Sequence, residues 1–130
     1  MARLSIFAAT MTLALAAGAA SAATLPIIAG TYVRDKYACR DAPFAALRDF
    51  DGRSFSGAHS SDCDTFILRR HGSNYTIRTT CKAEGDGTPM QPVTQLQTVQ
   101  VLSSKRFVVI RSTGDQAAYR LCGPLSRLQH

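Results

Sequence analysis

The sequence predicts an all-β domain, a small antiparallel barrel or sandwich of six to eight strands with one short helical turn and two disulfides. Three observations predict this fold class. Short runs rich in β-branched and aromatic residues alternate with turns that contain Gly, Ser, Asn or Asp. The connections between the later runs have hairpin length, which is typical of an antiparallel meander. The chain also has four cysteines, an even number that suits a disulfide framework.

The beginning of the chain has the three parts of a secretory signal peptide. Arg3 gives a positive start, an apolar run covers residues 6–17, and residues 20–22 (Ala-Ser-Ala) supply the small side chains that precede a cleavage site. The run is shorter than the roughly 20 apolar residues that cross a bilayer, so we expect cleavage after residue 22. The prediction is an exported protein, periplasmic or extracellular, with a single domain over residues 23–130 and no transmembrane segment after cleavage.

All four cysteines follow the predicted cleavage site. In an oxidising compartment we expect them to form two disulfides, which would help a small domain without tryptophan to stay folded. Four cysteines allow three pairings, and the sequence does not choose rigorously among them. Our preferred pairing is Cys39 with Cys63 and Cys81 with Cys122, because each bond would then join neighbouring strand ends.

The first half of the domain begins with a strand and continues into a turn. Residues 31–39 mix β-forming residues with a charged interruption, which predicts a bent first strand. Asp41 and Pro43 suit the start of a helix, so residues 41–50 predict a single helical turn, with a strand as the alternative. Asp51-Gly52 is a pair typical of tight hairpin turns.

The second half reads as hairpins. Residues 65–70 and 75–81 are rich in β-formers and flank a turn that contains Gly72, which predicts a strong hairpin. Residues 82–93 carry two glycines and two prolines, and we expect a surface loop there, the best candidate for a mobile binding loop. Three further strands are predicted at residues 94–102, 106–112 and 117–122.

The stretch from residue 49 to 64 gathers chemically active side chains, but no known arrangement fits it. A cysteine nucleophile would need Cys63 to be free, and the spacing of His59, Cys63 and His71 does not match zinc sites. The acidic residues before Gly52 lack the further oxygen ligands of a calcium loop. Residues 52–57 (Gly-Arg-Ser-Phe-Ser-Gly) depart from the nucleophile elbow, which needs glycine two residues after the serine.

We therefore expect a turn tied down by a disulfide, with no metal, no cofactor and no enzymatic activity. The less favoured alternative is a small hydrolase built on His59, with Asp62 or Asp64 and a nearby serine.

Charge is the feature that bears most on partners. Without Arg3 the chain has 14 basic residues against 9 acidic ones, a net charge of +5, and 11 of the 14 are arginine. The planar guanidinium of arginine matches carboxylate and phosphate groups. Six arginines on or beside the predicted strands form our candidate basic face: Arg69, Arg70, Arg78, Arg106, Arg111 and Arg120. We expect it to attract an acidic protein, an anionic glycan or a lipid headgroup, and a merely solubilising surface is the alternative. Nucleic acid is not expected, because export removes the target.

The layout of signal peptide, meandering strands and two disulfides is similar to that of small periplasmic β-barrel proteins, which include inhibitors of lysozyme and of secreted proteases. The resemblance covers the layout, and no functional residue is carried over from it. The predicted function is an exported non-enzymatic binding protein, such as an inhibitor or immunity protein, with Tyr32, Tyr37 and Tyr75 as aromatic anchors. The alternative is a carrier of a small molecule or lipid in a cavity inside the barrel.

Overall fold

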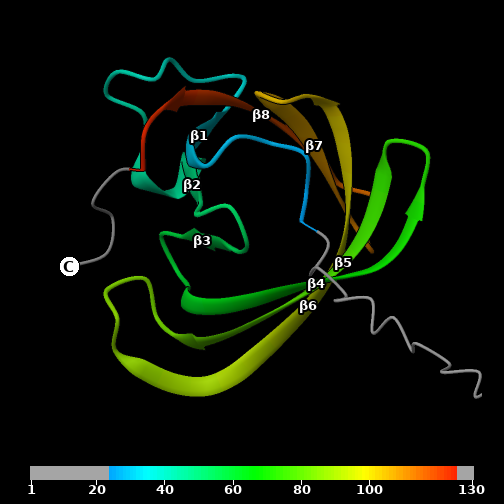
Figure 1. Ribbon diagram of the computed structural model, residues 1–130. Helices are drawn as coiled ribbons and strands as arrows, with labels where there is room; N and C mark the ends of the chain where they lie inside the picture. Colours follow the sequence, from blue (N-terminus) through cyan, green and yellow to red (C-terminus); the bar gives the residue numbers. More distant parts are fainter. Residues whose placement is uncertain (1–23, 126–130) are drawn as a thin grey trace, which may run out of the picture.

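The computed structural model describes residues 24–125, which form a nearly closed antiparallel β-barrel (Figure 1). The strands are β1 (Gly30–Arg34), β2 (Leu47–Phe50), β3 (Phe55–Gly57), β4 (Ser61–His71), β5 (Asn74–Ala83), β6 (Pro89–Ser103), β7 (Arg106–Arg111) and β8 (Gln116–Gly123), with one 3-10 turn, η1 (Phe44–Ala46). The predicted all-β class, the helical turn and the presence of two disulfides are confirmed. The predicted signal peptide, residues 1–22, lies outside the described residues.

The strands follow a meander in which the first and last strands are neighbours. The order across the sheet is β3-β2-β1-β8-β7-β6-β5-β4, so β1 pairs with both β2 and β8. The strands β3 and β4 stand at the two ends of this order and meet at a seam. There the Thr65 backbone N–H donates a hydrogen bond to Ser54 Oγ at 2.9 Å. Among the described residues no helix is long and apolar enough to cross a membrane.

One end of the barrel interior is filled with aromatic and aliphatic side chains, and we call it the apolar end. Tyr32, Phe50 and Phe107 are fully buried there, and the ring centroids of Tyr32 and Phe107 lie 5.0 Å apart. The segment that leads into β1 (blue in Figure 1) contributes the buried side chains Leu25 and Ile27 to the same core. This segment therefore covers the apolar end.

The region between β1 and β3 combines both predicted alternatives. The helical turn occupies Phe44–Ala46, and β2 follows at once at Leu47. Asp51 begins the turn before β3, where its carboxylate accepts hydrogen bonds from the backbone N–H groups of Arg53 and Ser54. The tight turn predicted from Asp51-Gly52 is confirmed, because Gly52 has a positive φ of 97°.

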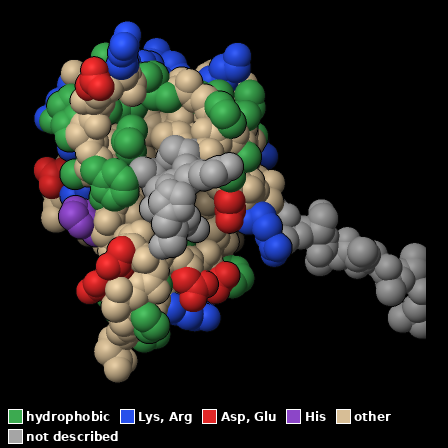
Figure 2. Space-filling model, turned by 90° about the vertical axis from the view of Figure 1, so that its left-hand side faces the viewer, with side chains coloured by type: hydrophobic (Ala, Val, Ile, Leu, Met, Phe, Trp, Pro, Cys, Tyr) green, Lys and Arg blue, Asp and Glu red, His purple; other side chains and the backbone are tan. Residues whose placement is uncertain are grey.

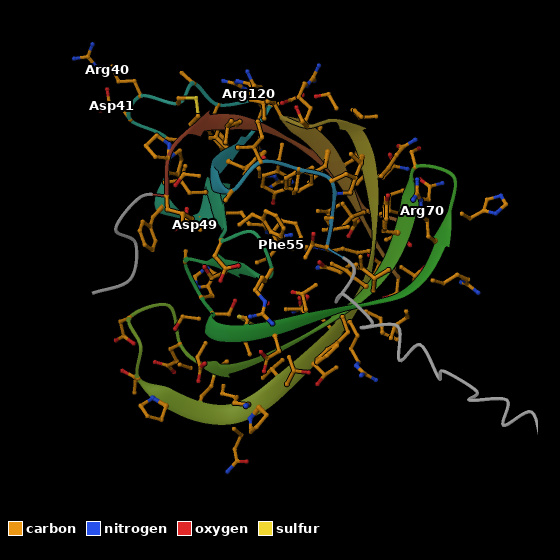
Figure 3. The ribbon with its side chains drawn as sticks, viewed as in Figure 1. Arg40, Asp41, Asp49, Phe55, Arg70 and Arg120 are labelled. Carbon is orange, nitrogen blue, oxygen red and sulfur yellow. A yellow bond between two sulfur atoms is a disulfide. The ribbon has the colours of Figure 1, made fainter. Side chains whose placement is uncertain are left out.

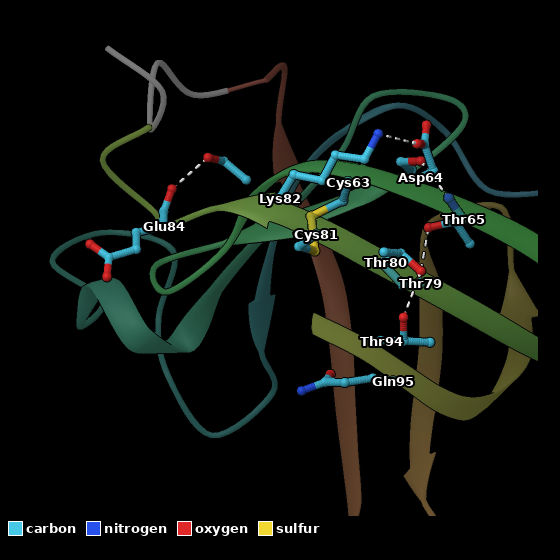
Figure 4. The surroundings of a disulfide bond; sticks show 12 residues. Cys63, Asp64, Thr65, Thr79, Thr80, Cys81, Lys82, Glu84, Thr94 and Gln95 are labelled. Carbon is cyan, nitrogen blue, oxygen red and sulfur yellow. Dashed lines mark hydrogen bonds and ion pairs between the residues drawn. A yellow bond between two sulfur atoms is a disulfide. The ribbon is translucent and has the colours of Figure 1, made fainter. Parts of the chain in front are cut away.

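The predicted disulfide pairing is wrong. The bonds join Cys39 to Cys122 and Cys63 to Cys81. Cys63 and Cys81 face each other directly in the β4–β5 hairpin, with their Cα atoms 4.0 Å apart (Figure 4). Cys122 lies on β8, which pairs with β1, and the loop after β1 brings Cys39 to it. The predicted pairing failed because it did not foresee that the first and last strands are neighbours.

The predicted long binding loop at residues 82–93 is also wrong. The strands β5 and β6 run through most of this range, and the connection is the short turn of residues 84–88. It is held by a backbone hydrogen bond from Glu84 N–H to the Thr88 carbonyl at 2.8 Å. Prolines fit the beginning of β6 because its pairing with β7 starts at Gln97, so the earlier residues are on an edge, where a missing N–H is tolerated.

Candidate functional site

The structure distributes the six arginines of the predicted basic face over several parts of the barrel. Arg106 and Arg120 lie on the outer side of β7 and β8, and both approach Asp35, at 2.6 Å and 3.8 Å. Arg120 also donates hydrogen bonds to the backbone carbonyls of Asp35 and Tyr37. These two arginines therefore anchor the loop after β1, close to the Cys39–Cys122 disulfide.

The other four arginines lie apart from this pair. Arg69 and Arg70 are near the tip of the β4–β5 hairpin (Figure 3), where Arg70 lies over the ring of Tyr75 at 5.2 Å. Arg78 is on the outer wall of β5, 5.6 Å from the ring of Phe66, and Arg111 ends β7. Basic and acidic side chains are interspersed over the face in Figure 2. The six arginines of the predicted basic face therefore belong to four strands, β4, β5, β7 and β8.

The predicted aromatic anchors are mostly unavailable to a partner. Tyr32 is fully buried and the exposed fraction of Tyr75 is 5 %, because both side chains belong to the core. Tyr37 is partly buried in the loop after β1, with the Lys36 ammonium 5.1 Å from its ring centroid. The prediction of Tyr32 and Tyr75 as anchors is therefore wrong.

In the hydrolase alternative, His59 and the two acidic residues lie in separate places, whereas Ser56 and Ser60 line the same pocket as His59. His59 is exposed in the turn between β3 and β4. Asp62 lines a pocket of about 310 Å³ together with Asp49 and Asp51, and His59 does not belong to its lining. The carboxylate of Asp64 lies 3.9 Å from the Lys82 ammonium on the outer wall (Figure 4). Among the described residues no group of three or more His, Cys, Asp or Glu side chains is arranged to hold a metal ion.

Strand alternation gives the second end of the barrel a polar interior, and we call it the polar end. Because side chains alternate between the two faces of a strand, a residue two positions from a core residue also faces inward. Five core residues have a polar neighbour of this kind: Arg34 for Tyr32, Arg48 for Phe50, Thr79 for Ile77, Gln97 for Val99 and Arg111 for Val109. The interior therefore changes from aromatic and aliphatic to polar and basic along its length.

Arg48 is the inward-facing arginine of β2 at the polar end. Its guanidinium is 5.2 Å from the ring centroid of Tyr119 and 5.5 Å from that of Phe55, and Figure 3 shows Phe55 near the middle of the ring of strands. The guanidinium borders a pocket of about 220 Å³. The pocket is lined by Arg48, Phe55, Ser56, His59, Ser60, Thr79, Cys81, Met90, Val93, Gln95 and Gln97.

The electrostatic surroundings of Arg48 are unfavourable for its charge. Burial lowers the pKa of the Arg48 guanidinium from its usual value; Tyr119 raises this pKa, and the positive charges of Arg111 and Arg34 lower it. An arginine stays protonated in a protein at neutral pH in any case. No Asp or Glu of the described residues lies within ion-pair distance of Arg48, in contrast to Arg106 and Arg120 beside Asp35.

The rest of the lining supplies hydrogen-bonding groups and a small apolar surface. The side-chain amides of Gln97 and Gln95 lie side by side, with Gln97 Nε2 donating to Gln95 Oε1 at 3.3 Å. Ser60 and Thr79 add hydroxyl groups, and Met90 contributes an apolar contact. A guanidinium, two amides and several hydroxyls around one cavity can bind an oxyanion and hold it in one orientation.

The candidate list from the sequence missed Arg34 and Arg48, although the signal was present. Within β2, Arg48 is two residues before Phe50, an aromatic residue that is a natural core candidate. Alternation from Phe50 points Arg48 into the interior. This rule of alternation applies only if residues 47–50 form a strand, and the favoured prediction there was a helical turn.

Comparison of the chain with protein-family models, with curated proteins and with solved structures finds no match.

Proposed function

We propose that the protein is an exported, non-enzymatic binding protein that holds a small anionic ligand at the polar end of its barrel, on Arg48. This proposal combines the acidic partner expected from the arginine content with the cavity inside a barrel. The two disulfides support export, because such bonds persist in oxidising compartments and are rare in the cytosol.

The single observation that carries the proposal is the charge of Arg48 inside the pocket. A guanidinium that is partly removed from water without a carboxylate partner costs folding free energy. The two aromatic rings offset part of this cost, since cation–π contacts contribute about 0.5 to 2 kcal/mol each. A bound carboxylate or phosphate would supply the missing partner through charge-assisted hydrogen bonds.

The size of the pocket limits the ligand. A volume of about 220 Å³ corresponds to roughly seven water molecules at their volume in the liquid. The aromatic core and the segment with Leu25 and Ile27 fill the interior beyond it. This volume favours a small organic acid over a lipid chain.

The test replaces Arg48 with an apolar residue of similar length. NMR titration of the ¹⁵N-labelled protein with butyrate and glutarate should give saturable shifts at the pocket residues, and Arg48→Met should abolish them. The same variant should have an equal or higher free energy of unfolding, because the apolar side chain removes the desolvation cost of a charge that has no carboxylate partner.

The matched control is Arg78→Met. Arg78 also lies over an aromatic ring, but on the outer wall, so this variant should bind both acids like the wild type. Identical shifts in the wild type and Arg48→Met, or no saturable shifts with either acid, would contradict the proposed function.

A further inference from the structure

Arg48 is one of three arginines that face the interior at the polar end. Arg34 ends β1, Arg48 is the second residue of β2 and Arg111 ends β7. The three residues come from different strands and are separated by 14 and 63 positions in the chain. The topology therefore brings together three positive charges that are far apart in the sequence.

The strand register connects the three side chains through shared neighbours. Arg48 pairs with Tyr32, and Arg34 lies two residues further along the same face of β1. Arg34 is in turn opposite Tyr119, whose ring contacts the Arg48 guanidinium. On the other side Arg111 is opposite Gln97, which lines the pocket beside Arg48.

The three arginines differ in depth. Arg48 borders the pocket and is partly buried, Arg34 is partly buried at the end of its strand, and Arg111 is exposed at the rim. Among residues 24–125 no carboxylate lies within ion-pair distance of any of the three guanidinium groups. Their charges therefore repel each other without an acidic residue of the described chain between them.

One anion on Arg48 would leave two of these three charges unbalanced. We infer that the ligand of the polar end is a dianion, a small organic acid with two separated carboxylates, one on Arg48 in the pocket and the other between Arg34 and Arg111 at the rim. This inference rests on the proposed function and specifies its ligand class. Two carboxylates would be drawn in by the summed field of the three arginines, and each would find a guanidinium partner.

The experiment compares two matched series of probes by NMR titration or calorimetry. The dicarboxylates malonate, succinate, glutarate and adipate are set against monocarboxylates with the same numbers of carbon atoms. We expect the best dicarboxylate to bind at least about tenfold more tightly than its matched monocarboxylate. Arg34→Gln and Arg111→Gln should each remove most of this advantage, because they lower the affinity for the dicarboxylate more than that for the monocarboxylate.

Arg53→Gln is the control variant, since Arg53 is an exposed arginine in the turn before β3, and it should bind every probe like the wild type. If dicarboxylates and monocarboxylates bind equally well and Arg48→Met still abolishes binding, the inference of a dianionic ligand is overturned and the proposed function remains. If dicarboxylates still bind more tightly than monocarboxylates in both Arg34→Gln and Arg111→Gln, the inference of a dianionic ligand is also overturned. Failure of every probe to bind would overturn both the dianion and the proposed function.

Discussion

Tyr32 connects the core of the barrel to the segment that covers its apolar end. Its ring packs against Phe107, and its hydroxyl donates a hydrogen bond to the Ile28 carbonyl at 2.6 Å. Ile28 is held a second time by a backbone hydrogen bond to the Ser104 carbonyl. Burial raises the pKa of the Tyr32 phenol above its ordinary value of 10.0. The residue therefore makes stability depend on pH in the alkaline range.

Tyr32→Phe should change that dependence. Because the phenol has a higher pKa in the folded protein, the unfolded chain releases this proton first, so the contribution of Tyr32 is complete below about pH 10 and falls as the pH rises further. Urea unfolding followed by circular dichroism should show a steeper loss of stability above pH 10 in the wild type than in the variant.

At pH 7 the same variant should be less stable by about 1 kcal/mol, the usual net contribution of one hydrogen bond. Amide exchange at Ile28 should also become faster, because one of its two attachments is lost. Parallel stability curves for the two proteins from pH 7 to 11 would show that Tyr32 does not titrate as expected.

At the scale of elements, two turns pack closely against each other beside the pocket. The turn between β3 and β4 carries Ala58, and the turn between β5 and β6 carries Gly85. A Cβ atom on Gly85 would lie 1.8 Å from the Ala58 carbonyl oxygen, so the two backbones are in contact only because residue 85 has no side chain. Ser61 Oγ donates a further hydrogen bond to the Glu84 carbonyl.

Gly85→Ala should therefore separate the two turns and destabilise the protein by about 1 to 3 kcal/mol, the usual cost of overpacking. The control is Gly57→Ala, where the nearest atom to an added Cβ is the Leu47 carbonyl oxygen at the ordinary contact distance of 3.7 Å. Denaturant unfolding of both variants measures the difference. Equal stability of the two variants would show that the turns can move apart at no cost.

The register of the β4–β5 hairpin explains why the Cys63–Cys81 disulfide was not predicted. Pairing outward from the predicted turn places Arg70 opposite Tyr75, as observed. Without an irregularity this register would set Cys63 opposite residue 82. The bulge between Ile67 and Arg69 shifts the register by one residue, which brings Cys63 opposite Cys81. A bulge leaves no reliable mark in the sequence, so the hairpin was predictable and its crosslink was not.

At the scale of the whole molecule, closure of the barrel depends on the pairing of β1 with β8. These strands are distant in the sequence, and neither hairpin signals nor alternation indicate that they meet. The all-β class and most strands could be predicted because they depend on local patterns. The polar end could not be predicted, because its residues come together only when β1, β2, β6 and β7 surround one interior.

The disulfide Cys39–Cys122 supports this closure, and its loss should cost more than the loss of Cys63–Cys81. The two bonds span 83 and 18 positions, for which the loop-entropy relation gives about 4.5 and about 3 kcal/mol. We expect the double variant C39A/C122A to have a lower free energy of unfolding than C63A/C81A, measured by urea denaturation. The reverse order would show that the hairpin crosslink, and not the link between first and last strands, limits stability.

The seam between β3 and β4 lacks the continuous hydrogen bonding of the rest of the barrel wall. Every other neighbouring pair of strands is joined by a ladder of backbone hydrogen bonds. Among the described residues β3 and β4 share no such ladder: Thr65 donates to Ser54 Oγ, and Gly57 and Ser60 are bonded at the turn that joins the two strands. We therefore expect the wall to open first along this line, before any of the seven ladders breaks.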